Sequence, residues 1–286
     1  MIKVFNFKKS LIPLTLINRP SKSIKSPYVA DAKNLKGEKC LVHVPSLGLA
    51  GQCSNGSKIL ATPSKKNSKT DFIAQAVCYE DIDKKKVIIG ANPYTAELIC
   101  KSLIQNDIWN PFKGWGLISK PKNLDYKADL YLEKNKNFNI IEIKNVVCAS
   151  YDPKRDKNGE KTRFYDHKTP FLRAGVYPYG DLNQFYKGKK VVSERSIRQI
   201  DLMKKNKDKF NFCILFLVNR GDCEIFKPCW KAEPIYAKSL LSAQQCGINL
   251  HAIKINWTLK GCYFDKELKI DLEEWQFFLM KLGSLS

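Results

Sequence analysis

Short apolar runs alternate with glycine, serine, asparagine and proline between residues 10 and 80. The runs lie at 11–17, 28–30, 40–44, 58–61 and 72–79. Runs of this length, bounded by residues that favour turns, are typical of β-strands. Five strands in about 70 residues predict a small closed sheet, which fits an OB-fold-like β-barrel. We therefore expect a barrel domain over residues 1–84.

The periodicity changes after a boundary near residues 81–86. The expected elements are, in chain order, a strand at 87–89, a helix at 94–106, a hairpin around residue 135, a helix at 193–204 that begins after Ser193, a strand at 210–219, a helix at 234–245 ended by Gly247, and a strand at 248–255. The strand at 210–219 is apolar on both faces and is predicted to be central in its sheet. Helices between strands predict a mixed α/β (α+β) domain at 85–262, followed by a tail at 263–286.

Residues 149–190 are predicted to be a long insertion in this second domain. Their first part is polar, and their second part places aromatic residues among basic ones. These aromatic residues are Phe164, Tyr165, Phe171, Tyr177, Tyr179, Phe185 and Tyr186. Such a pattern is typical of a surface on which bases stack. The aromatic side chains can equally hold a long loop against its domain.

The hairpin places two carboxylates and an ammonium group together. If its turn is centred on residues 135 and 136, paired residues have numbers that sum to 271, so Asp129 is opposite Glu142. Opposed residues on antiparallel strands share a face, with Cβ atoms roughly 4.5–5.5 Å apart. The alternation of side chains puts Lys144 on the same face and turns Ile141 and Ile143 away.

This arrangement suits metal-assisted hydrolysis of phosphodiesters. Asp129 and Glu142 would bind Mg²⁺ or Mn²⁺, and Lys144 would orient the attacking water or neutralise developing charge. The simpler alternative is an ion pair across a hairpin. The same strand face also carries Ile140 and Val146, however, and charges among apolar residues need partners or a ligand. The sequence therefore indicates a candidate catalytic and metal site at these three residues.

Charge is the strongest global signal. The chain of 286 residues has a formal net charge of +21, and residues 1–70 hold 13 Lys and Arg against 2 Asp and Glu. Such an excess attracts polyanions, and we expect DNA as the partner, with RNA as an alternative. A general bias towards lysine, or another acidic macromolecule as partner, would explain part of the charge. Lys65, Lys66 and Lys69 form a basic loop that we predict contacts phosphates.

The cysteines, the histidines and the hydropathy of the chain argue against a zinc-binding or a membrane-spanning protein. The ten cysteines include no C-x-x-C pair, so we expect free thiols in a reducing compartment and no zinc site. His251 lies within a predicted strand and is expected to be structural. No run of about 18 apolar residues is present, so no transmembrane helix is expected. We predict a cytoplasmic protein without membrane contact.

Several blocks of the sequence resemble the sugar fermentation stimulation protein A family. Residues 43–53, which begin with His43-Val44-Pro45, resemble a box of that family with the pattern His-x-Pro-Asn-x-Gly-x-x-x-Gly-Cys. The other similar blocks, in the same order as in the family, are 128–130, 141–146, 193–195 and 242–248. The resemblance covers most of residues 10–260.

This resemblance implies an N-terminal OB-type barrel, a PD-(D/E)XK nuclease-like domain and binding to DNA. His43 and Arg195 fall within motifs of that family. Arg195 or Arg198 would hold a phosphate. The chain departs from the family pattern, with Ser196 in place of a glycine and Gln199 in place of a histidine. The upstream glutamate of the pattern is also absent; Glu97 and Asp125 are the acids that could replace it. Two functions follow, a DNA-binding protein that is largely independent of sequence and a Mg²⁺- or Mn²⁺-dependent nuclease.

Overall fold

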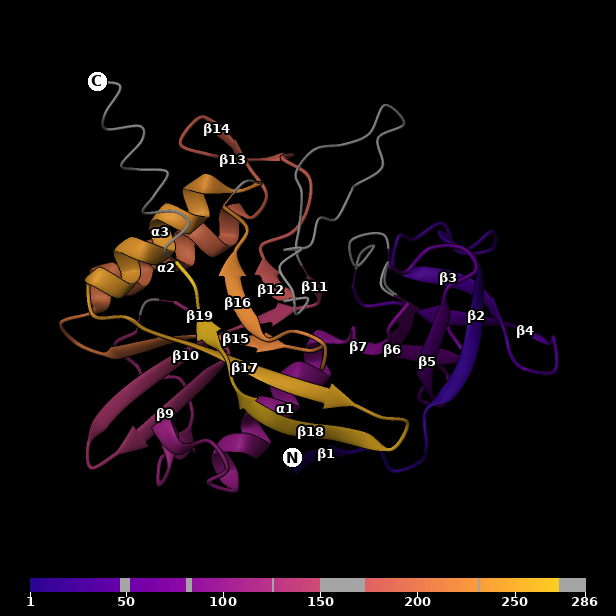
Figure 1. The fold of residues 1–286 in the computed structure, drawn as a ribbon, viewed down its shortest axis with the longest axis horizontal. Coiled ribbons are helices and arrows are strands. Elements are labelled where there is room, and N and C mark those ends of the chain that lie inside the picture. Colours follow the sequence, from indigo (N-terminus) through magenta and orange to yellow (C-terminus); the bar gives the residue numbers. More distant parts are fainter. Residues whose placement is uncertain (47–51, 81–83, 125, 150–172, 231, 273–286) are drawn as a thin grey trace. The chain divides into compact units, whose positions relative to one another are not determined.

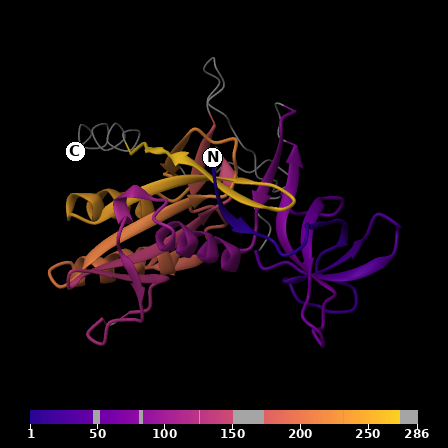
Figure 2. The same ribbon diagram turned by 90° about the horizontal axis from the view of Figure 1, so that it is seen from below.

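The computed structural model describes residues 1–46, 52–80, 84–124, 126–149, 173–230 and 232–272 (Figures 1 and 2). The chain divides into two compact units, each of which is assembled from separate segments. Unit 1 comprises residues 1–103, 219–222 and 254–266, and unit 2 comprises residues 104–218, 223–253 and 267–286.

A closed barrel forms the larger part of unit 1. Its strands are β2 (Ile12–Asn18), β3 (Val29–Lys33), β4 (Lys39–His43), β5 (Lys58–Pro63) and β6 (Phe72–Glu80). Strand β2 pairs antiparallel with β3 and β5, β3 with β4, and β5 with β6. A parallel pairing of β4 with β6 closes the ring. Register shifts in the β2–β3 and β5–β6 pairings add the local bend that closure requires. This connectivity is that of the OB fold, so the predicted barrel is confirmed.

Unit 1 also contains elements that the sequence pattern assigned to the second domain. Strand β7 (Lys86–Gly90) pairs antiparallel with β6, and most of helix α1 (Pro93–Gln105) follows it in the same unit. Strands β1 (Ile2–Asn6) and β18 (Gly261–Glu267) pair antiparallel. The boundary expected at residues 84 and 85 therefore differs from the observed division, because the apolar strand β7 extends the barrel sheet.

The distant segments of unit 1 meet around Gly90. The N–H of Gly90 donates to the carbonyl of Asn219 at 2.8 Å, and the indole N–H of Trp257 donates to the side-chain oxygen of Asn219 at 2.9 Å. A Cβ atom at Gly90 would overlap the indole ring of Trp257, which is buried. Only glycine therefore fits between these segments.

We expect Gly90→Ala to destabilise the protein by about 1–3 kcal/mol, because the added methyl group has no space beside the buried indole. The midpoint of urea-induced unfolding measures this change. Gly116→Ala is the matched control, since its Cβ would meet nothing closer than 3.7 Å. Equal unfolding midpoints for Gly90→Ala and wild type would contradict the close packing.

Unit 2 is built on a sheet with the strand order β17-β15-β10-β9-β8, in which only the first part of β17 belongs to this unit. The strands are β8 (Gly116–Ile118), β9 (Leu130–Lys134), β10 (Asn137–Val146), β15 (Asn211–Val218) and β17 (Asn249–Trp257). Strand β15 runs parallel to β10 and is buried along almost its whole length. The prediction of a central strand there is confirmed.

A second sheet and two helices complete unit 2 (Figure 1). The second sheet has the order β11-β12-β16-β19, and its strands are Cys148–Ala149, Ala174–Tyr177, Ile225–Pro228 and Lys269–Ile270. Helices α2 (Glu194–Asn206) and α3 (Pro234–Gln245) lie side by side. A short 3₁₀ helix at Asn110–Phe112 precedes β8. Helix α3 has the predicted bounds, and Gly247 follows it with a φ of 85°.

Two predictions about irregular segments need correction. The expected insertion at 149–190 contains strand β12 and the hairpin of β13 (Gln184–Tyr186) and β14 (Lys189–Val191), whereas Phe164, Tyr165 and Phe171 lie outside the described residues. The expected tail from residue 263 begins instead with most of β18 and then β19. Strand pairing, which local patterns cannot show, places these described parts of both segments in sheets.

All ten cysteines fall within the described residues and are free thiols. Among the described helices, none is long and apolar enough to cross a membrane.

Candidate functional site

The predicted hairpin has the expected register. Residues Asn135 and Lys136 form its turn with φ values of 51° and 62°, and the pairs of β9 and β10 have numbers that sum to 271. Asp129 lies one residue before β9, and its Oδ2 accepts a 2.7 Å hydrogen bond from the backbone N–H of Ile143. The backbone of β10 therefore fixes the position of the Asp129 carboxylate beside Glu142.

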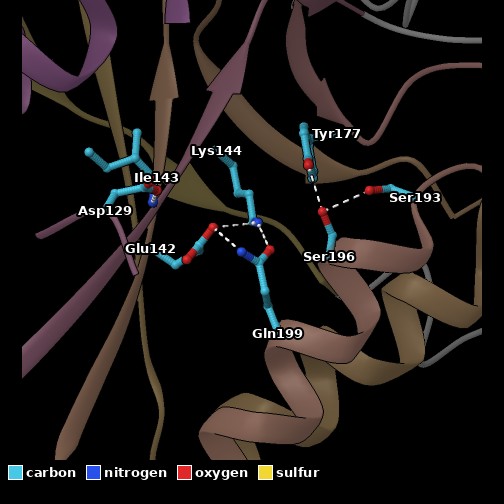
Figure 3. Close-up of polar contacts among 8 residues, drawn as sticks. All are labelled: Asp129, Glu142, Ile143, Lys144, Tyr177, Ser193, Ser196 and Gln199. Carbon is cyan, nitrogen blue, oxygen red and sulfur yellow. Dashed lines mark hydrogen bonds and ion pairs between the residues drawn. The ribbon is translucent and has the colours of Figure 1, made fainter. Parts of the chain in front are cut away.

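Glu142, Lys144 and Gln199 form a buried triangle of hydrogen bonds (Figure 3). The ammonium Nζ of Lys144 lies 3.2 Å from Oε1 of Glu142 and 2.6 Å from the side-chain oxygen of Gln199. The amide nitrogen of Gln199 donates to the same Oε1 of Glu142 at 2.5 Å. Glu142 and Lys144 are only 3% and 5% exposed. This pair is therefore not a solvated surface ion pair.

The buried carboxyl group of Glu142 has a raised pKa, and one of its oxygens has no hydrogen-bond partner among the described residues. Burial raises the pKa of Glu142, and the charge of Asp129 raises it further, whereas Lys144 and the amide of Gln199 act in the opposite direction. Its Oε2 is buried and makes no hydrogen bond to any described residue. The same holds for the hydroxyl groups of Tyr126 and Tyr236, whose pKa values are raised by burial and by Glu142.

A buried carboxylate oxygen without a hydrogen bond costs free energy of folding, unless a ligand or a water molecule binds to it. Within the described ranges, no group of three or more His, Cys, Asp or Glu residues could hold a metal ion. Asp129 and Glu142 together supply two carboxylates, which fits a hard cation that keeps several waters and uses one or two protein carboxylates. The residues therefore fit Mg²⁺, Mn²⁺ or Ca²⁺ and do not form a zinc-type cage.

Helix α2 supplies two polar groups to the interior that the sequence reasoning treated only as departures from a family pattern. Gln199 holds the Glu142 and Lys144 pair, and the hydroxyl of Ser196 lies 2.8 Å from the hydroxyls of both Tyr177 and Ser193. Both residues are buried on the side of α2 that carries Ile197 and Ile200. A glutamine among inward-facing apolar positions was the signal that could have identified this role.

The other residues predicted for unit 2 do not join this site in the described structure. Arg195 and Arg198 are exposed, and Arg198 forms an ion pair with Glu194. His251 has the structural role expected for it, because its Nδ1 lies 2.5 Å from Oε1 of Glu267 and its ring contacts Trp109 edge-on. Asp125, one of the two acids considered as a replacement for the missing glutamate, lies outside the described residues.

The other considered acid, Glu97, belongs to unit 1 and pairs with Lys101 at 2.6 Å. The carboxylate of Glu97 thus already has a cation four residues along the same helix. It therefore has a structural explanation that requires no part in the Glu142 site.

The three lysines that were predicted to contact phosphates lie on one loop of the barrel. Lys65, Lys66 and Lys69 are exposed between β5 and β6, the fourth and fifth barrel strands. The loop between the first and second barrel strands, residues 19–28, contains Arg19, Lys22 and Lys25 and no acidic residue. OB folds bind oligonucleotides with these two loops and with the face of the second and third strands.

These loops are held by hydrogen bonds at their bases. Asp31 on β3 accepts from the Ser21 hydroxyl at 2.6 Å and from the N–H of Lys22 at 2.9 Å, which lowers the pKa of its carboxyl. His43, at the end of β4, is half-buried, and its ring lies 6.4 Å from that of Tyr28, which is 42% exposed. Two aromatic rings, one of them exposed, thus lie together where the loop 19–28 meets the end of β4.

The fold and the buried carboxylate–lysine site define a strand-rich α/β protein with an OB-type barrel. Residues 191–261 match the family described as Sugar fermentation stimulation protein RE domain. The chain is similar to curated sugar fermentation stimulation protein homologs. One from Carboxydothermus hydrogenoformans is 24% identical, over 83% of this chain and 90% of the relative. One from Thioalkalivibrio sulfidiphilus is 22% identical, over 93% and 98%.

A solved structure has the same fold. The structure of Pyrococcus furiosus SfsA in complex with Ca²⁺ matches with a TM-score of 0.71 and 19% identity, over 95% of this chain and all of that chain. With the matches above, this fold confirms the resemblance to the sugar fermentation stimulation protein A family that was drawn from the sequence motifs.

Proposed function

We propose that this protein binds DNA through the barrel of unit 1, largely independently of sequence. One observation carries the proposal: the closed OB topology puts the acid-poor loop 19–28 and the lysines of loop 64–71 at the two positions that such barrels use to bind oligonucleotides. Flexible lysines suit the phosphate backbone, which carries no sequence information. The ten free thiols fit a cytoplasmic location.

Replacing Lys65, Lys66 and Lys69 together with alanine is expected to weaken binding to all DNA sequences alike. Each phosphate contact that is lost should reduce the slope of log affinity against log salt by about 0.9 on duplex DNA. Fluorescence anisotropy over a salt series measures both quantities. Replacing Lys101, Lys113 and Lys207, which lie outside the barrel loops, is the charge-matched control. An unchanged slope in the loop variant would overturn the assignment of these lysines.

A second candidate function is metal-dependent hydrolysis of phosphodiester bonds in unit 2. It is favoured by the unsatisfied Oε2 of Glu142 beside the ammonium of Lys144, and by the Ca²⁺ complex of the P. furiosus protein. Asp129 and Glu142 would hold Mg²⁺ or Mn²⁺, and a bound cation lowers the pKa of a water ligand. Lys144 would neutralise charge that develops on the phosphate. Incubation of end-labelled DNA with Mn²⁺ tests this candidate directly.

A further inference from the structure

The β13–β14 hairpin of unit 2 presents an aromatic ring that no packing requirement explains. Its strands pair Phe185 with Lys190, and a two-residue turn at Lys187 and Gly188, with φ values of 47° and 78°, joins them. Phe185 is 60% exposed. Most of its ring is therefore in contact with water and available to a ligand.

Polar contacts hold the opposite face of the hairpin on helix α2. The side-chain oxygen of Gln184 accepts a 3.0 Å hydrogen bond from the N–H of Glu194, the first residue of α2. The hydroxyl of Tyr186 donates to Asp201 at 2.5 Å. Because side chains alternate along a strand, these contacts direct Phe185 and Lys190 away from α2. The ring of Phe185 is thus displayed on a hairpin that is fixed at both ends of its first strand.

The charge around this ring favours an anionic partner. Residues 181–201 contain five basic residues, Lys187, Lys189, Lys190, Arg195 and Arg198, and three acidic residues, Asp181, Glu194 and Asp201, which gives a net charge of +2. Glu194 is paired with Arg198. All five basic side chains are exposed. Lys190 shares the strand face of Phe185, whereas Lys189 is paired with Tyr186 on the other face. An exposed aromatic ring beside a cation matches the chemistry of an unpaired nucleotide, which offers a flat base and a phosphate.

We propose that the β13–β14 hairpin is a stacking platform for an unpaired base, with Phe185 beneath the base and Lys190 beside its phosphate. The proposal rests on the proposed binding of nucleic acid and narrows its ligand to a single-stranded segment. Helix α2 holds the hairpin through Glu194 and Asp201 and carries Gln199 of the buried triangle. The platform and the candidate metal site are therefore held by the same helix.

The test compares two single-stranded ligands with equal numbers of phosphates, a fluorescent oligothymidylate and an abasic oligomer of the same length. Phe185→Ala is expected to weaken binding of the oligothymidylate roughly 5- to 150-fold, the range for losing one stacked base. Binding of the abasic oligomer should stay unchanged. Phe185→Tyr should retain most of the affinity. Leu182→Ala removes a neighbouring side chain that is 49% exposed and should have no effect.

Several outcomes would overturn the platform. Phe185→Ala could bind oligothymidylate as tightly as wild type, or lose affinity equally for both ligands. It could instead lose binding only to vesicles that contain phosphatidylserine, which would identify the hairpin as a membrane-surface contact. If the loop lysine variant loses binding while Phe185→Ala does not, DNA binding stands and the platform fails. If wild type binds neither oligomer nor duplex, both proposals fail.

Discussion

Lys144→Ala is expected to slow the proposed Mn²⁺-dependent cleavage of DNA by roughly 10²–10³-fold, the effect of removing one preorganised group that stabilises a transition state. The ammonium of Lys144 is held by Glu142 and Gln199 at 3.2 and 2.6 Å, so its position is fixed before a substrate arrives. Single-turnover cleavage of end-labelled single- and double-stranded DNA measures the rate. Asp129→Ala should lower the same rate by removing a metal ligand.

Lys254→Ala is a matched control for the loss of a buried lysine. Lys254 is also on a strand, is 4% exposed and pairs with Asp265 at 3.1 Å, but it belongs to unit 1. Removing either buried lysine is expected to destabilise the fold, so rates must be compared at a temperature where circular dichroism shows every variant folded. If the cleavage rate of Lys144→Ala equals that of wild type, Lys144 is only the ion-pair partner of Glu142.

Mn²⁺ is expected to raise the melting temperature of the wild-type protein, and Glu142→Gln should abolish this rise. A cation that binds only the folded state stabilises it by about 2.7 kcal/mol at one hundred times its dissociation constant. For a protein of 286 residues the gain corresponds to a shift of about 4–5 °C. The neutral amide that this substitution introduces would remove the charge that draws a cation to Oε2. Differential scanning calorimetry with and without Mn²⁺ measures the shift.

The dependence of this shift on pH has a definite sign. Protons compete with the cation for the carboxylate, and burial raises the pKa of Glu142. The stabilisation by Mn²⁺ should therefore be complete above that raised pKa and disappear as the pH falls through it. Glu233 is another buried carboxyl of unit 2 with a raised pKa, so Glu233→Gln should keep the response to Mn²⁺. Absence of heat on titration with millimolar Mn²⁺ would refute the metal site.

Local patterns predicted the hairpin of Asp129 and Glu142 in detail. A short polar turn between two apolar strands leaves few registers, and the alternation of side chains selects one of them, so residues whose numbers sum to 271 face each other across the pair. Helix α3 was equally predictable, because Pro234 and Gly247 mark its two ends. In both cases the determining interactions lie within about fifteen residues of each other in the sequence.

The contacts that the sequence did not show are made between distant segments. Gln199 is 57 residues from Glu142 along the chain, and only the packing of α2 brings them together. Strand β7 was assigned to the wrong unit because its apolar pattern is the same whether it extends the barrel sheet or begins another. Periodicity identifies a strand and its buried face, and the choice of partner depends on the rest of the chain.

The assembly of unit 1 from three segments has a consequence for biosynthesis. The partner of β1 is β18, and the space beside Gly90 is filled by Trp257, so both wait for residues that are synthesised much later. Translation proceeds from the N-terminus, and a domain generally folds as a unit. The ribosome must therefore have synthesised the chain through residue 266 before this unit closes. A fragment that stops after residue 84 would lack β18 and Trp257, whereas a circular permutant that begins near residue 254 would supply both early.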